Sequence, residues 1–120
     1  MKNGAEVFKG RRLKRGARII LKNRLHGLYG SMEDLMDSIL MDEHDKVNKI
    51  QLVIYWRNGK PIASVYRFDQ ELMAYCKRRY RRKGYATACV SALTYRGTMY
   101  AHATEHEEFW NRQKCKIDIM

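Results

Sequence analysis

The sequence predicts a single small α/β domain built on a mixed sheet, and three observations support this. The 120 residues suffice for one hydrophobic core but not for two. Two strand-like runs, at 50–56 and 62–66, flank Asn58-Gly59, a strong hairpin signal. Segments with helical spacing alternate with further strand-like segments. The balance of 45% hydrophobic and 31% charged residues is typical of a folded chain.

The N-terminal part is expected to contribute least to the core. Residues 1–16 are basic, contain glycines and have few bulky apolar side chains, which predicts a mobile arm. The domain is then expected to span 17–120, with a first strand at 17–21. Ser31 and Asp34 resemble an N-cap and an acidic first turn. The following helix has five apolar residues at helical spacing, namely Met32, Leu35, Met36, Ile39 and Leu40.

The second half of the chain continues the alternation of strands and helices. A strand is predicted at 71–78 and a closely packed helix at 86–93, which ends near Gly97. The remaining predicted elements are a short strand at 99–103, a short helix at 105–112 and a last strand at 115–119.

The charge of +11 and the pI near 9.8 predict attraction to phosphates or carboxylates, on a cofactor, a nucleic acid, an acidic protein or an anionic membrane. Three cysteines form an odd set without metal-ligand spacing, so neither a disulfide framework nor a metal site is expected, and a reducing cytoplasm fits best. Because no run reaches the ~20 apolar residues that span a bilayer, no membrane partner is expected.

The strongest chemical signal lies in the loop between the 71–78 strand and the 86–93 helix. Gly84 allows a ligand to approach the backbone closely, and the first amides of the following helix present the positive end of its dipole. Arg81, Arg82 and Lys83 add charges that form strong hydrogen bonds to phosphate. The loop is therefore predicted to bind a pyrophosphate.

This loop is similar to one in a known family. Arg81, Gly84 and Ala86 form the pattern Arg-x-x-Gly-x-Ala, which resembles the R/Q-x-x-G-x-G/A pyrophosphate loop between the fourth strand and third helix of GNAT N-acetyltransferases. Glu71 begins the preceding strand where the family often has an acidic residue, and Tyr80 supplies the aromatic that commonly precedes the loop. Residues 109–117 resemble the closing segment of the family, so the resemblance covers roughly 17–120.

The resemblance implies a mostly antiparallel mixed sheet flanked by helices and an acetyl-CoA cofactor. It implies direct attack on the thioester by an amine of a protein, an aminoacyl-tRNA or a small molecule. Glu71 would act as the general base, and His102, with His106 as a weaker candidate, would relay a proton. Trp110 occupies the position of the usual tyrosine acid. The implied cofactor-binding residues are Cys76, by its backbone, and Arg81, Arg82, Lys83, Gly84, Tyr85, Ala86 and Thr87.

Other interpretations remain open at this stage. The domain could be a basic nucleic-acid-binding module that uses the arm and the 77–83 cluster, with Tyr75, Tyr80 and Tyr85 stacking on bases. It could also be a degenerate GNAT fold used for protein interaction, and a homodimer is compatible with either. Glu71 could simply start an edge strand in water.

Several further residues have both a structural and a functional interpretation. The hairpin aromatics Tyr55, Trp56 and Tyr66 could form core or the wall of an acceptor site. Cys76 and Cys89 are expected to be packing residues rather than nucleophiles. The arm could be a solvated tail, or it could bring an acidic protein or an RNA-associated acceptor toward the cleft.

Overall fold

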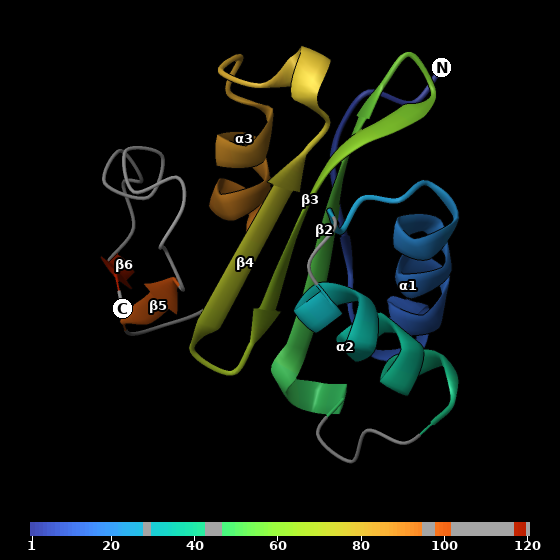
Figure 1. Cartoon of the computed structure of the whole chain (residues 1–120), viewed down its shortest axis with the longest axis vertical. Coiled ribbons are helices and arrows are strands. Elements are labelled where there is room, and N and C mark those ends of the chain that lie inside the picture. Colours follow the sequence, from blue (N-terminus) through green and yellow to red (C-terminus); the bar gives the residue numbers. More distant parts are fainter. Residues whose placement is uncertain (28–29, 43–46, 95–97, 102–116, 120) are drawn as a thin grey trace.

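The computed structural model describes residues 1–27, 30–42, 47–94, 98–101 and 117–119. They form one domain with a six-stranded sheet in the order β1-β2-β3-β4-β5-β6 and helices on both faces (Figure 1). The pairs from β1 to β4 are antiparallel, whereas β4–β5 and β5–β6 are parallel. The predicted class, a small α/β domain with a mixed and mostly antiparallel sheet, is therefore confirmed. The strands are β1 (Gly4–Phe8), β2 (Ile50–Arg57), β3 (Lys60–Phe68), β4 (Glu71–Cys76), β5 (Met99–Ala101) and β6 (Ile117–Ile119).

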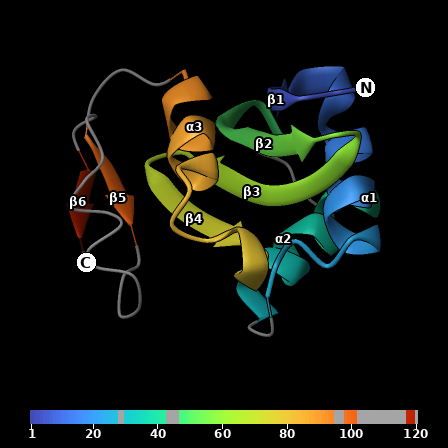
Figure 2. The same cartoon turned by 90° about the horizontal axis from the view of Figure 1, so that it is seen from above.

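The described residues contain three α-helices, which divide between the two faces of the sheet. The first face is covered by α1 (Leu13–Lys22) and α2 (Gly30–Leu40), and the second by α3 (Tyr85–Ala92) (Figure 2). Alternate side chains of each strand point to opposite faces, so the sheet separates two apolar clusters. On the first face Leu52, Ile54 and Tyr66 pack with the buried sides of α1 and α2. On the second face Val53, Val65 and Leu72 pack beneath α3.

The N-terminal segment differs from its prediction. Residues 4–8 are not a mobile arm but the edge strand β1, which pairs with β2 from Gly4↔Trp56 to Phe8↔Leu52. The predicted strand at 17–21 is wrong, because these residues lie in α1. A helix buries the side chains spaced by three and four residues, Leu13, Ala17 and Ile20. A strand there would have placed Ala17 and Ile20 on opposite faces, so the two side chains could not share one core.

The central elements agree with their predictions. The β2–β3 hairpin turns at Asn58 and Gly59, both with positive φ (51° and 77°), as a two-residue turn of this kind requires. The predicted helices at 31–40 and 86–93 correspond to α2 and α3. Strand β4 ends at Cys76, two residues earlier than predicted, because Arg78–Tyr80 form a 3₁₀ turn.

The C-terminal predictions are tested only in part. Met99–Ala101 and Ile117–Ile119 are strands, as predicted for the two segments to which they belong. The predicted helix at 105–112 lies outside the described residues. No helix within the described ranges combines the length and the apolar character needed to cross a bilayer.

Candidate cofactor-binding and active site

The loop after β4 approaches α3 through two residues in the left-handed region. Arg82 has φ 63°, and Gly84, the N-cap of α3, has φ 84° and ψ 6°. A left-handed residue followed by the right-handed residues of a helix turns successive N–H groups toward one concavity, which is an anion-binding arrangement. The first bond of the helical ladder runs from the Ala88 N–H to the Gly84 carbonyl over 3.0 Å. The amides of Tyr85 and Ala86 precede that bond and have no intrahelical acceptor.

The space beside Gly84 is open. A Cβ placed on this residue would meet no heavy atom within 4 Å, and Arg81, Arg82, Lys83 and Gly84 are all exposed. No side chain caps the N-terminus of α3. The residues predicted to hold a pyrophosphate are therefore brought together on an accessible turn, where backbone donors and full positive charges adjoin.

Aromatic and cationic side chains hold this loop against the sheet. The Tyr85 ring packs on Tyr55, with 4.8 Å between the ring centroids. The guanidinium of Arg81 donates from Nε to the Cys76 carbonyl over 2.9 Å and lies 6.0 Å from the centre of the Tyr75 ring. Arg81 thus joins the loop to the end of β4. No local sequence pattern indicates the contact between Tyr55 and Tyr85, since the two residues lie thirty positions apart.

Strand β4 presents part of its backbone at an edge. The Lys77 N–H donates to the Ile62 carbonyl over 2.9 Å, and antiparallel pairs alternate in the direction of their polar groups. The backbone groups of Ala74 and Cys76 consequently point away from β3. Strand β5 pairs with β4 only at Glu71 and Leu72, so no described strand lies opposite Ala74 and Cys76. Their amides and the Ala74 carbonyl form a short polar edge that begins beside the loop, where the Cys76 carbonyl accepts from Arg81.

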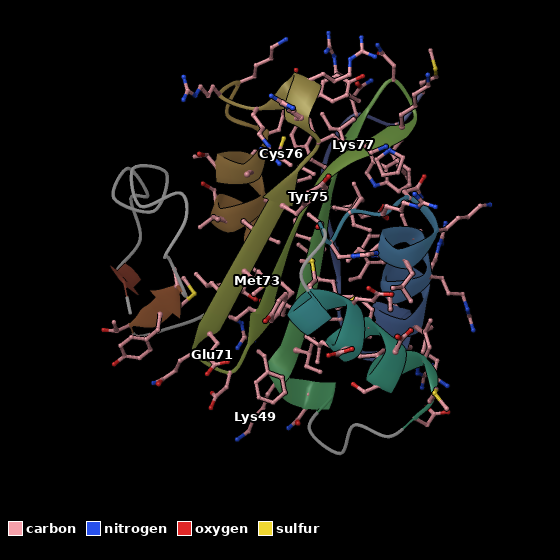
Figure 3. The ribbon with its side chains drawn as sticks, in the orientation of Figure 1. Lys49, Glu71, Met73, Tyr75, Cys76 and Lys77 are labelled. Carbon is pink, nitrogen blue, oxygen red and sulfur yellow. The ribbon has the colours of Figure 1, made fainter. Side chains whose placement is uncertain are left out.

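Glu71 lies at the other end of β4 from the loop, as Figure 3 shows for Glu71 and Cys76. Five residue steps of strand lead from Glu71 to Cys76, which corresponds to about 16 Å. Glu71 is exposed and pairs in register with Phe68 and Tyr100. It lines a hollow of about 320 Å³ together with Phe68, Asp69, Gln70 and Tyr100. The sequence pattern did not indicate this hollow, because it is assembled by the β3–β4 turn and β5.

The surroundings of Glu71 are partly apolar. Burial raises the pKa of the neighbouring Tyr66 phenol, and the negative charge of Glu71 raises it further. Tyr66 is only 6% exposed and belongs to the core of the first face. Met73 and Tyr75 follow Glu71 at alternate positions of β4 and pack against the same cluster. The carboxylate therefore stands at the border between this core and solvent.

The cysteines differ in environment. Cys89 is buried, and burial, reinforced by the nearby Cys76, raises its pKa to about 12. Burial also raises the pKa of Cys76, although the charge of Arg81 opposes this. Because a thiolate is the reactive form, these shifts suit packing residues, as expected. The hairpin aromatics also have structural contacts: Tyr66 lies in the core, and the Trp56 Nε1 donates to Glu6 over 3.0 Å.

Some predicted site residues cannot be placed. His102, His106 and Trp110 lie outside the described residues, so no geometry relates them to Glu71. Within the part of the chain that is described, no three potential metal-ligating side chains gather.

Comparison with known proteins finds similarity to solved structures but not to known sequences. No family model and no curated protein matches the sequence. The chain is similar to the crystal structure of a possible acetyltransferase from Clostridium difficile 630, with 17% sequence identity and a TM-score of 0.46. The likeness covers 97% of this chain and 95% of that chain. At these values it carries no argument about activity, which has to come from the site itself.

Proposed function

We propose that this protein is an acyl-CoA-dependent N-acetyltransferase of the GNAT type, which transfers an acetyl group to a primary amine. The observation that carries the proposal is the turn at Gly84. Its left-handed backbone brings free amides of α3 and the charges of Arg82 and Lys83 to one exposed site after β4. Backbone donors, a helix N-terminus and cationic side chains together suit a pyrophosphate.

The residues present suit two successive parts of acetyl-CoA. The amides from Arg82 to Thr87 and the side chains of Arg82 and Lys83 would hold the pyrophosphate. The polar edge at Ala74 and Cys76 suits the amides of a pantetheine arm, because an extended chain can hydrogen-bond to an unpaired strand edge. This edge leads from the loop toward Glu71. When bound, acetyl-CoA supplies an activated thioester.

Glu71 is proposed as the general base. A primary amine is protonated at neutral pH, and it must lose a proton before it can attack a carbonyl. A carboxylate at the border of an apolar core and a hollow can accept that proton directly or through a water molecule. The hollow beside Glu71 would then admit the acceptor amine.

The competing interpretation, base stacking by Tyr75, Tyr80 and Tyr85, has less support. Each of these rings already faces a protein group. Arg81 lies over Tyr75, Tyr85 packs on Tyr55, and Tyr80 has two guanidinium groups near its ring, those of Arg57 at 5.6 Å and Arg79 at 5.3 Å. Bases would have to displace these contacts before they could stack.

The cofactor assignment is tested by thermal unfolding with acetyl-CoA or CoA. A ligand present at 100 times its Kd stabilises the folded state by about 2.7 kcal/mol, which raises Tm by several degrees. An unchanged Tm at saturating CoA would show that the assignment is wrong.

The catalytic assignment is tested by Glu71→Gln. We expect acetyl transfer to fall by roughly 10²-fold, with an unchanged Tm shift on CoA binding. Asp37→Asn, which removes a carboxylate from the exposed side of α2, is the matched control and should keep the wild-type rate. Equal rates for Glu71→Gln and Asp37→Asn would remove Glu71 from the mechanism. CoA binding without turnover on any amine would favour a degenerate, non-catalytic GNAT fold.

A further inference from the structure

Helix α1 exposes a row of positive charges. Arg15, Arg18 and Lys22 are exposed residues of α1, and exposed Arg11 precedes them by one turn in η1 (Gly10–Arg12). At about 100° per residue, the three residues of α1 lie within a sector of about 60°. The buried residues of the helix, Leu13, Gly16, Ala17 and Ile20, occupy the opposite side. We call Arg11, Arg15, Arg18 and Lys22 the α1 basic row.

The charge of this row is not neutralised within the described residues. The neighbouring cations Arg12 and Lys14 form ion pairs with Glu6 and Asp42. In the described ranges, no acidic side chain comes within ion-pair distance of any member of the row. Helix α1 itself contains no acidic residue. The row therefore concentrates positive potential on one exposed side of the domain.

We infer that the α1 basic row binds the phosphodiester backbone of nucleic acid. Eleven residue steps at 1.5 Å give the row a length of about 16 Å, over which a duplex carries about ten phosphate charges. A nucleic-acid backbone is thus dense enough in charge to engage every member at once. Three of the four members are arginines, whose planar fork bonds phosphate through two N–H groups.

The surroundings of the row argue against a membrane surface. A basic helix that lies in a bilayer inserts its apolar face into the acyl region. Here Leu13, Ala17 and Ile20 are at most 2% exposed, because they form core with Phe8 and Leu52. The only large apolar side chains that stand exposed among the described residues are Met1 and Met41. Within the described residues, α1 exposes no large apolar side chain, so the attraction of the row is electrostatic.

The composition of the row also determines what it can distinguish. Contacts to phosphate fix position but carry no sequence information, which is read at base edges. The row contains no aromatic or amide side chain for stacking on bases or reading their edges. We therefore expect RNA and DNA of any sequence to bind within a few-fold of one another, since charge alone does not sense the 2′-hydroxyl.

This binding surface is separate from the proposed cofactor site. Helix α1 packs on the first face of the sheet and α3 on the second, as Figures 1 and 2 show. Nucleic-acid binding at the row does not require CoA binding at Gly84, and the inference stands whether or not the protein transfers acetyl groups.

The test uses fluorescence anisotropy of the full chain with labelled 20-mers of RNA and DNA, single-stranded and duplex, from 50 to 200 mM salt. Four phosphate contacts predict that affinity falls by roughly 50-fold for single strands and 150-fold for duplexes over this range. In Arg15→Gln/Arg18→Gln/Lys22→Gln only Arg11 of the row remains. The loss of affinity between 50 and 200 mM salt should therefore shrink to about threefold. Glutamine has nearly the helix propensity of arginine and lysine, and thermal unfolding checks that this variant is folded.

The matched control, Arg78→Gln/Arg82→Gln/Lys83→Gln, removes three exposed charges from the other basic cluster. It should keep the salt dependence of the wild type. The inference is overturned if the α1 variant keeps that dependence, or if the loop variant alone loses it. It is equally overturned if the wild type binds polyglutamate or anionic vesicles but neither RNA nor DNA at 50 mM salt.

Discussion

Substitutions at Gly84 separate the shape of the proposed phosphate site from its charge. At φ 84° and ψ 6°, Gly84 holds a conformation that costs an ordinary L-residue about 1–2 kcal/mol. A Cβ there would contact no heavy atom within 4 Å, so no steric penalty adds to this cost. Gly84→Ala should therefore lower Tm by about 4 °C or more. Asn and Asp tolerate the left-handed region better, so they should lower Tm less.

The comparison of Gly84→Asn with Gly84→Asp is decisive, because the two side chains have almost the same shape and differ by one negative charge. Without CoA, we expect Gly84→Asn and Gly84→Asp to unfold at similar temperatures. Saturating CoA should still raise the Tm of the asparagine variant. It should leave the aspartate variant unchanged, since a carboxylate beside the amides of Tyr85 and Ala86 repels the pyrophosphate and competes for its donors.

The assay is thermal unfolding with and without CoA, accompanied by calorimetric measurement of the Kd. Equal CoA affinity in the asparagine and aspartate variants would refute the reasoning, because a carboxylate at residue 84 must repel a pyrophosphate bound next to it. Loss of binding in both variants would show that the site requires the absence of any side chain, and charge would then not be the determinant.

Two further predictions test how the N-terminal segment is held in the domain. Gly16→Ala should lower Tm, because the new Cβ would lie 2.8 Å from Cβ and Cγ of Phe8; overpacking costs about 1–3 kcal/mol, more than the ~1 kcal/mol gained in helix propensity. Partial burial of Glu6 opposes ionisation, yet hydrogen bonds from Lys2 and Arg12 lower its pKa below the ordinary value. The carboxylate therefore stabilises the fold above the pKa of the unfolded chain, and this contribution is lost as the pH falls through the lowered folded pKa. The Tm difference between wild type and Glu6→Gln should be largest at pH 7 and shrink below about pH 4. A constant difference would show that the ion pairs of Glu6 do not stabilise β1, and an unchanged Tm for Gly16→Ala would show that α1 does not rest closely on Phe8.

Local signals in the sequence predicted much of the fold and the exposed glycine turn before α3. The Asn58-Gly59 turn fixes the β2–β3 hairpin, because two left-handed positions suit few other residues. The glycine and the basic residues before α3 occupy four consecutive positions, 81–84. Their arrangement therefore depends little on the rest of the chain. Glu71 also starts a strand as predicted, because the chain turns at Asp69, with φ 52°, and pairs Glu71 with Phe68.

Tertiary structure decided which secondary structure the N-terminal segment adopts. Residues 4–8 form a strand because β2 offers an edge fifty residues away, and no local pattern encodes that pairing. Ile19 and Ile20 favour a strand by propensity, yet α1 forms because a helix places Leu13, Ala17 and Ile20 together on the core. Packing overrides β propensity, since the area buried by three apolar side chains outweighs preferences of less than 1 kcal/mol per residue.

Tertiary structure also decided how the candidate site residues lie relative to one another. The sequence by itself placed Glu71 and the Arg81–Thr87 loop on either side of one strand, but not what each would face. Strand β4 sets Glu71 about 16 Å from Cys76, its last residue before the loop. The sheet adds Tyr100 of β5 beside Glu71 and Tyr55 of β2 beneath Tyr85. It likewise turns the basic N-terminal residues into a row on α1, because burial of the apolar side of a helix forces its charged side into solvent. Spacing along the chain determines which side chains share a face, whereas only the packed sheet determines what lies opposite that face.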